Sequence, residues 1–283
     1  MTSHCRGKKY LCAFADKRYA TALQRFSEQA RHMGVYDGIH LYTEDDLDRN
    51  FYEHFEGKFH LRGFGYWVWK PQIILQTLSQ MEEGDLLQYT DVGCHLDKGG
   101  VKRLLDYFDM VSLSETGLLA FNMSWSRSEQ WTKGDLLDYF HVRDNEITFQ
   151  SQHCATVLFI KKCPRSMDIV RQWLNVYYDD FSLMDDTPSR SANFKGFYEH
   201  RHDQSAWSIL ARLNHVPYLS DEELKAFDEE GKYPIYIKRD LGRSHSLGYR
   251  IKRKITRYRC YVMSKILWGK RRKRYFKKYK GLS

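Results

Sequence analysis

The chain begins with short apolar segments on either side of a longer segment with helical periodicity. Residues 8–16 hold an apolar segment bounded by Lys8, Lys9 and Asp16, which predicts a buried first strand. Residues 19–33 carry apolar side chains at helical spacing, which predicts a helix. Residues 38–42 form another short apolar segment, which predicts a second strand. Strand, helix and strand at this spacing predict a βαβ unit, and such units build parallel sheets covered by helices.

A second helix and a third strand follow. Pro71 stands where this helix is expected to have its first residue, and Gly84 stands where it is expected to end. Residues 86–90 predict a strand, with Asp91 at its carboxyl end. Ligands of open α/β sheets bind at the carboxyl ends of strands. The pattern alone therefore predicts that Asp91 faces a ligand site.

The remaining pattern adds two strands, two helices and a loop. Residues 118–121 and 155–160 predict strands, and residues 164–178 predict a helix. Asp203 is expected to cap the N-terminus of a further helix. Residues 179–197 are rich in Asp, Ser and turn formers, which predicts a loop. The predicted fold class is α/β, with a Rossmann-like, mixed but mostly parallel sheet flanked by helices.

The composition excludes several classes of protein. Aromatic residues make up 15% of the chain, which favours a structured protein over a disordered one. None of the six cysteines forms a Cys-x-x-Cys pair, so we expect reduced thiols and no zinc site. Residues 1–9 are polar and no segment of 18 apolar residues occurs, so neither a signal peptide nor a membrane span is expected. These features predict a cytoplasmic protein.

Positive charge is concentrated at the C-terminus. The chain has 45 Lys and Arg against 36 Asp and Glu. Of these, 15 basic residues and no acidic ones lie in residues 249–283, so residues 1–248 hold 30 basic and 36 acidic residues. The basic character is therefore local. The predicted organisation is one folded domain at 1–248 and a basic, aromatic, helical tail at 249–283.

The tail predicts a membrane surface as partner. Cations interleaved with Tyr, Trp and aliphatic residues are typical of segments that bind anionic lipid head groups, at about 1 kcal/mol per Lys or Arg. We expect the protein to lie peripherally on the inner face of the cytoplasmic membrane. Nucleic-acid binding through phosphates, or a merely solvated tail, are the alternatives. No nucleic acid is expected, because helix-turn-helix, RNA-recognition and zinc signatures are missing from the sequence.

Three segments carry a resemblance to a known family. They are RGFGYWVWKP at 62–71, GDLLQYTDVGC at 84–94 and HRHDQS at 200–205. In this order they resemble bacterial glycosyltransferases of lipopolysaccharide, O-antigen and capsule synthesis, over about residues 8–215. The resemblance implies a GT-A-like fold and a nucleotide-sugar donor, with a UDP-sugar expected. It also implies sugar transfer to a hydroxyl group of a lipid-linked glycan or lipopolysaccharide.

The resemblance also implies a site for the departing diphosphate. GT-A enzymes usually hold Mn²⁺ or Mg²⁺ with Asp-x-Asp at a strand end, because these cations favour oxygen ligands. Here the triplet is Asp91-Val92-Gly93, which lacks the second carboxylate. If the chain stays extended, His95 points to the same side as Asp91 and joins it as a metal ligand. Alternatively, Asp91 holds the ribose hydroxyls and the metal is absent.

The aromatic segment before Pro71 has two interpretations. Lys70 beside the amides of a helix N-terminus suits an anionic phosphate, but it also fits a solvated surface lysine. Trp67 and Trp69 favour ordinary core packing, and a place in the donor pocket is the alternative.

The implied catalytic residues are Asp203 and Gln204, where a carboxylate would deprotonate the acceptor hydroxyl or stabilise the developing oxocarbenium ion. His245 is a weaker candidate for a metal ligand. The residues implied in donor binding are Phe14, Asp16, Gly65, Trp69, Lys70, Asp91, Gly93, Gln152 and His202.

Two other functions compete with sugar transfer. The basic arm fits a non-enzymatic nucleic-acid-binding protein, in which changing Asp91 would abolish no activity. The broken Asp-x-Asp fits a degenerate GT-A scaffold, which would bind no nucleoside diphosphate.

Overall fold

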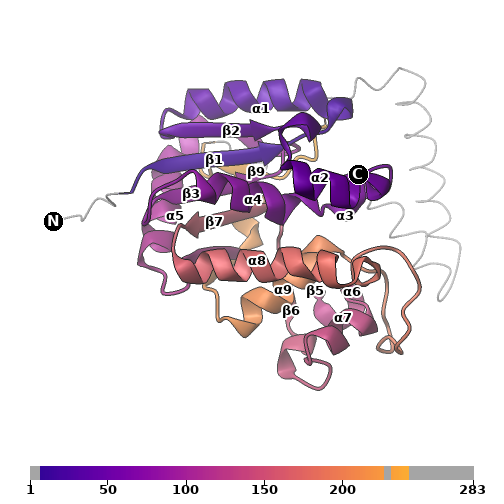
Figure 1. The fold of residues 1–283 in the computed structure, drawn as a ribbon. Coiled ribbons are helices and arrows are strands. Elements are labelled where there is room, and N and C mark those ends of the chain that lie inside the picture. The colour runs from indigo at the N-terminus through magenta and orange to yellow at the C-terminus, as the bar shows by residue number, and fades with distance from the viewer. Residues whose placement is uncertain (1–6, 226–230, 242–283) are drawn as a thin grey trace, which may run out of the picture. The chain divides into compact units, whose positions relative to one another are not determined.

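The computed structural model describes residues 7–225 and 231–241, and these form a mixed sheet with helices on both faces (Figure 1). The predicted tail at 249–283 and His245 lie outside the described residues. The strands are β1 (Lys9–Phe14), β2 (Gly38–Tyr42), β3 (Leu86–Thr90), β4 (His95–Leu96), β5 (Leu118–Arg127), β6 (Ser151–His153), β7 (Val157–Lys161), β8 (Tyr218–Ser220) and β9 (Ile235–Tyr236).

The α-helices separate these strands along the chain, as a βαβ pattern requires. They are α1 (Ala20–Met33), α2 (Arg49–Phe55), α3 (Arg62–Tyr66), α4 (Trp69–Ser79), α5 (Val101–Leu113), α6 (Ser128–Trp131), α7 (Gly134–Tyr139), α8 (Pro164–Asp179) and α9 (Asp203–Leu213). Among the described residues, no helix is long and apolar enough to cross a bilayer.

The main sheet has seven strands in the order β2-β1-β3-β7-β5-β6, with β8 also paired to β5. β1 is parallel to β2 and β3, and β5 is parallel to β8. β7 is antiparallel to both of its neighbours, and β6 is antiparallel to β5. Five of the seven strands therefore run in one direction. This confirms the predicted α/β class with a mixed, mostly parallel sheet flanked by helices.

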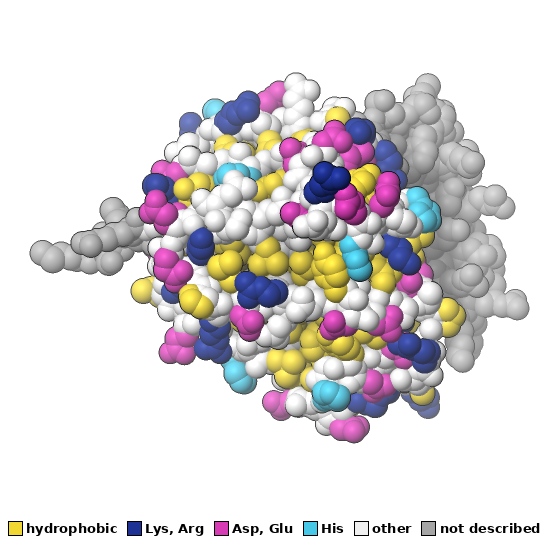
Figure 2. All heavy atoms as spheres, in the orientation of Figure 1, with side chains coloured by type: hydrophobic (Ala, Val, Ile, Leu, Met, Phe, Trp, Pro, Cys, Tyr) yellow, Lys and Arg dark blue, Asp and Glu magenta, His cyan; other side chains and the backbone are white. Residues whose placement is uncertain are grey.

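Alternating side chains divide the core between the two faces of the sheet. In β1, Leu11 and Ala13 pack with α1 and α5 on one face, while Cys12 and Phe14 pack on the other face with α4, α8 and α9. Period-two alternation in a strand buried on both sides produces this division. Figure 1 shows α4 and α8 in front of the sheet, and Figure 2 shows interspersed positive and negative side chains on that face.

The sheet topology brings distant segments together at one edge. The carboxyl ends of the parallel strands β1 and β3 meet there. Because β7 is antiparallel, its start lies at the same edge, and the Asp91 amide donates to the Thr156 carbonyl across 2.9 Å. The short β4–β9 pair attaches residues 237–241 near this edge, where the Asp240 amide donates to the Gly93 carbonyl.

Three local expectations from the sequence are wrong. α4 begins at Trp69 rather than at Pro71, and it ends at Ser79, so Gly84 belongs to the turn before β3 with φ of 88°. Gly84 donates its amide to the Lys162 carbonyl in that turn. Asp203 is the first residue of α9, and its N-cap is His202. The Asp203 carboxylate accepts a hydrogen bond from the buried Lys70 ammonium.

Candidate functional site

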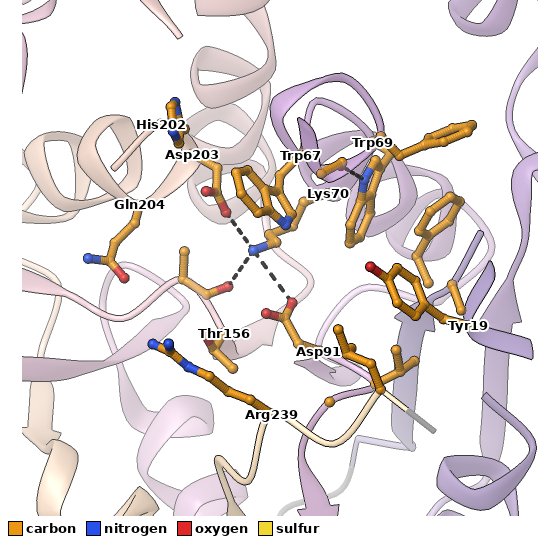
Figure 3. A pocket seen from close by; sticks show the side chains of 18 of the residues that line it. Tyr19, Trp67, Trp69, Lys70, Asp91, Thr156, His202, Asp203, Gln204 and Arg239 are labelled. Carbon is orange, nitrogen blue, oxygen red and sulfur yellow. Dashed lines mark hydrogen bonds and ion pairs between the residues drawn. The ribbon is translucent and has the colours of Figure 1, made fainter. Parts of the chain in front are cut away.

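A cavity of about 470 Å³ lies at the carboxyl edge of the sheet, which is a usual volume for a small-molecule site (Figure 3). Its walls come from the ends of β1 and β3, the segment from α3 to α4, residues 155–156, the start of α9, and residues 237–241. The segments are far apart in sequence, and the crossover connections of the sheet bring them together.

The floor of the cavity is a buried cluster of three charges. Lys70 is only 2% exposed, and its Nζ lies 2.5 Å from Asp203 Oδ2 and 3.5 Å from Asp91 Oδ1. The same ammonium donates to the Ala155 carbonyl at 3.1 Å. Figure 3 shows Lys70 between Asp91 and Asp203. The lysine is neither solvated nor available as a free phosphate ligand, because two carboxylates already hold it.

Burial and charge act against each other in this cluster. Burial disfavours the charged form of Lys70, but Asp203 and Asp91 outweigh it and raise the Lys70 pKa above its usual value. Burial raises the pKa of Asp203, against the lowering effect of Lys70. The two shifts are compatible, because one ammonium faces two carboxylates. Lys70 stays protonated while Asp203 holds a proton to a higher pH than an ordinary aspartic acid.

Asp91 is the carboxylate of the cluster that reaches the cavity most openly. Its side chain is 31% exposed, against 8% for that of Asp203. The buried Tyr89 hydroxyl donates to Asp91, and the Cys94 amide donates to the Asp91 carbonyl at 2.9 Å. Fixed in this way, Asp91 presents carboxylate oxygens that can accept hydrogen bonds from ligand hydroxyl groups.

The segment before α4 adopts a left-handed turn. Residues 63–67 all have positive φ, and these include Phe64, Tyr66 and Trp67, which are not glycines. Such residues cost of order 1–3 kcal/mol each, and they cluster at functional sites. At Gly63 a Cβ atom would lie 2.7 Å from the Trp67 ring, so only glycine fits there. The turn directs Trp67 and the Gly63 backbone into the cavity wall.

Aromatic rings line the wall on the β1 side. Phe14 and Trp69 are stacked, with ring centroids 4.2 Å apart. The Trp69 indole donates to the Gly63 carbonyl at 3.0 Å, which ties the wall to the left-handed turn. Asp16 also lines the cavity, but its carboxylate binds the Arg18 guanidinium and caps the turn that follows. The rings form a flat apolar surface suited to a planar or ring-shaped ligand.

His202 and Gln204 flank Asp203 in the cavity lining. His202 has φ of 50°, and its Nδ1 lies 2.8 Å from the Met184 carbonyl. Burial lowers the pKa of His202 to about 4, so the ring is neutral at pH 7. Gln204 Nε2 donates to Gln152 Oε1 at 2.7 Å. This bond holds the Gln204 side chain in place.

The structure brings nine of the twelve predicted site residues to the cavity. Those that line it are Phe14, Asp16, Trp69, Lys70, Asp91, Gly93, His202, Asp203 and Gln204.

The other three predicted residues lie outside the lining. Gly65 is buried beneath it, where its φ of 79° and the close approach of Val68 and Phe59 explain the glycine. Gln152 is fully buried in β6, where it bonds Ser205 and Gln204, so it positions site residues without facing the cavity.

His95 does not join Asp91 as a metal ligand. The chain turns at residues 91–94 instead of staying extended, as the bond from the Cys94 amide to the Asp91 carbonyl shows. His95 Nε2 lies 2.9 Å from Asp240 Oδ2, and its Nδ1 lies 3.3 Å from Gln29 Nε2. Both ring nitrogens are therefore engaged outside the cavity.

The residues of the cavity do not fit a divalent cation. Mn²⁺ or Mg²⁺ needs several oxygen ligands, but each carboxylate of the lining is already engaged: Asp91 and Asp203 share the Lys70 ammonium, and Asp16 binds Arg18. Within residues 7–225 and 231–241, no group of three or more His, Cys, Asp and Glu side chains is placed to hold a metal ion. The position between the two carboxylates holds a fixed amino group.

Three arginines of the lining were not predicted as site residues. Arg62, Arg201 and Arg239 all line the cavity. Arg62 and Arg201 belong to two of the segments that carry the family resemblance, so their position beside Gly63 and His202 was the available signal. Nothing local marks Arg239, which reaches the cavity through the tertiary contact between residues 93 and 240.

No protein-family model matches the chain, and neither does any curated protein. Solved structures of glycosyltransferases show a weak likeness. Galactosyltransferase LgtC, in complex with donor and acceptor sugar analogs, is 15% identical with a TM-score of 0.43, over 75% of this chain and 74% of that one. Mouse xyloside xylosyltransferase 1 is 10% identical with a TM-score of 0.42, over 75% and 84%. The bifunctional glycosyltransferase WbbM is 11% identical with a TM-score of 0.45, over 78% and 40%. These values assign neither a family nor an activity.

Proposed function

We propose that the chain is a glycosyltransferase that moves a sugar from a nucleotide-sugar donor to a hydroxyl group of a glycan acceptor. The observation that carries the proposal is the Asp91–Lys70–Asp203 cluster at the floor of the cavity, beneath an aromatic wall and beside three arginines. Carboxylates suit sugar and ribose hydroxyls, aromatic rings suit a base or a pyranose, and guanidinium groups suit phosphates. A nucleotide-sugar combines these three chemistries in one molecule.

The geometry supports a division of roles. Asp91, the more exposed carboxylate, binds hydroxyl groups of the donor. Asp203, whose pKa lies above its usual value, takes the proton of the acceptor hydroxyl as the new bond to the sugar carbon forms. The bond from that carbon to the phosphate oxygen breaks, and the nucleoside diphosphate leaves with the electron pair. Gln204, held by Gln152, orients the sugar.

The first test is Asp91→Asn, which preserves shape and removes the charge. We expect turnover to fall by about 10²–10³-fold, because a group that binds the reacting ligand is lost. The free energy of unfolding should change little, since Asp91 is partly solvated. Donor turnover is measured as release of nucleoside diphosphate, and binding as thermal shifts with UDP-, GDP-, CMP- and dTDP-sugars.

Asp109→Asn is the matched control, because Asp109 is an exposed residue of α5 outside the cavity. Full activity of Asp91→Asn would contradict the site assignment. The absence of a thermal shift with any donor would contradict the proposed function. It would favour the scaffold or the nucleic-acid-binding interpretation, which RNA binding would then separate.

We propose further that the acceptor is a lipid-linked glycan or lipopolysaccharide at the inner face of the cytoplasmic membrane. The support is the basic, aromatic sequence 249–283, which has 15 Lys and Arg and no Asp or Glu. Truncation after residue 248 is expected to abolish co-sedimentation with vesicles that contain anionic lipid, while donor hydrolysis persists. Unchanged sedimentation of the truncated chain would refute the tail as the anchor, and vesicles of neutral lipid are the control.

A further inference from the structure

The three arginines of the cavity are positioned by different elements. Arg62 opens α3, and its Cζ lies 5.7 Å from the Trp67 ring centroid. Arg201 precedes α9, and its Cζ lies 4.2 Å from the Trp131 ring centroid. Arg239 follows β9 with φ of 52°. Aromatic contacts orient the first two guanidinium planes without consuming their N–H donors.

The acidic partners of these arginines are sparse. Arg62 lies 3.8 Å from Asp186, and Arg201 lies 3.5 Å from Glu199, both longer than a charge-assisted hydrogen bond. Within the part of the chain that the structure describes, Arg239 pairs with no carboxylate, and its side chain is exposed in the lining. Much of the hydrogen-bonding capacity of the three guanidinium groups is thus available to a ligand.

The arginines are close enough to repel one another. Burial lowers the pKa of Arg201, Glu199 opposes this, and the charges of Arg239 and Arg62 act in the same direction as burial. Like charges gathered around one cavity, in a domain whose acidic residues outnumber its basic ones, raise the local concentration of anions. The cavity is therefore prepared for an anionic ligand before any ligand binds.

Lys70 occupies the place that a divalent cation would need. Its ammonium lies between two carboxylates of the lining, 2.5 Å from Asp203 and 3.5 Å from Asp91. A second cation between them would have to displace a buried, protonated amine, and it would meet the repulsion of three guanidinium groups. Fixed positive groups of the protein therefore take the place of the metal ion that an Asp-x-Asp motif would hold.

From this arrangement we infer that Arg62, Arg201 and Arg239 bind the diphosphate of the donor directly and that the enzyme needs no divalent cation. The inference rests on the proposed function and deepens it. Guanidinium groups bind phosphate oxygens in a forked, charge-assisted geometry. As the sugar–phosphate bond breaks, the charge on the leaving diphosphate grows, and the same groups stabilise it. Lys70 keeps the two carboxylates from repelling that diphosphate.

The test is calorimetric titration of the full chain with UDP, GDP and dTDP, first in EDTA and then in Mn²⁺ or Mg²⁺. We expect one of these nucleotides to bind in EDTA with an affinity within about threefold of that in the metal. Binding that requires the metal would overturn the inference and leave the proposed function standing. Failure of all three nucleotides to bind under either condition would overturn the inference, and the thermal shifts with the four donors would then decide the proposed function.

Arginine variants test the second part of the inference in EDTA. Arg239→Gln and Arg201→Gln are each expected to weaken nucleotide binding by about 10–100-fold. Arg31→Gln is the matched control, because it removes the same charge from a residue far from the cavity. Arg31 lies in the last turn of α1, at the edge of the sheet where β2 begins. A loss no larger for Arg239→Gln and Arg201→Gln than for Arg31→Gln would overturn the assignment. Circular dichroism and thermal unfolding check that each variant folds.

Discussion

Lys70→Met is expected to lower the free energy of unfolding by about 3–5 kcal/mol and to abolish sugar transfer. The substitution keeps the length of the side chain but leaves Asp203 buried without its partner at 2.5 Å. Removal of one member of a buried ion pair is far more damaging than loss of a surface pair, since the remaining charge stays desolvated. Urea unfolding measures the first effect, and release of nucleoside diphosphate measures the second.

A double variant separates the buried charge from lost packing. Lys70→Met combined with Asp203→Asn removes both charges, so we expect it to recover a substantial part of the lost stability. Activity should stay absent, because both groups belong to the site. Lys161→Met is a control for the loss of a lysine whose ammonium, among the described residues, bonds the backbone carbonyls of Ser112 and Ser114. Equal urea midpoints for Lys70→Met and the unchanged protein would contradict the cluster.

Acidification from pH 7 to pH 5 is expected to destabilise the fold, with His153 and His202 contributing about 2 kcal/mol each. Burial lowers the pKa of His153 to about 3 and that of His202 to about 4. An unfolded histidine titrates near 6.5, so the unfolded state binds more protons below that pH. Stability is therefore complete above about pH 6.5 and is lost as the pH falls toward the folded values.

Other titratable groups also affect the stability between pH 7 and pH 5. His200 acts in the same direction, because burial lowers its pKa well below the usual value. Asp203 acts in the opposite direction, because its raised pKa lets the folded state bind a proton first. Burial opposes the charge of Asp135 and Glu223, but hydrogen bonds lower their pKa values overall, so their stabilisation is lost only below about pH 4.

Urea unfolding at pH 7, 6 and 5 measures the loss, and His153→Phe is the informative variant. By distance and angle neither ring nitrogen of His153 makes a hydrogen bond among the described residues, and the backbone of Phe121 is the smallest influence on its pKa. The ring lies 5.0 Å from that of Tyr218. A phenylalanine therefore suits the position and should remove about 2 kcal/mol of the stability loss between pH 7 and pH 5. An unchanged slope between pH 7 and pH 5 would show that His153 is not the source.

The elements that were predicted correctly are those whose information is local. β1, β2, β3 and β7 are short apolar segments, and α1 and α8 carry helical periodicity, so the side-chain pattern alone indicates them. Asp91 at the end of β3 was also predicted, because the carboxyl edge of an α/β sheet follows from strand direction. The boundaries of α4 were not predicted, because the left-handed turn before it depends on packing against Trp67.

The sequence by itself determined the fold class, the edge of the sheet that holds the cavity, and most of the residues that line it. Only the tertiary structure decided what Lys70 does. Its ammonium meets Asp203 across 133 positions of sequence and Asp91 across the sheet edge, so no local pattern reveals that its charge is already paired. The position of Arg239 was decided in the same way. Burial and nearby charges set the charge state of a side chain. Both depend on the folded structure rather than on the residues that are adjacent in sequence.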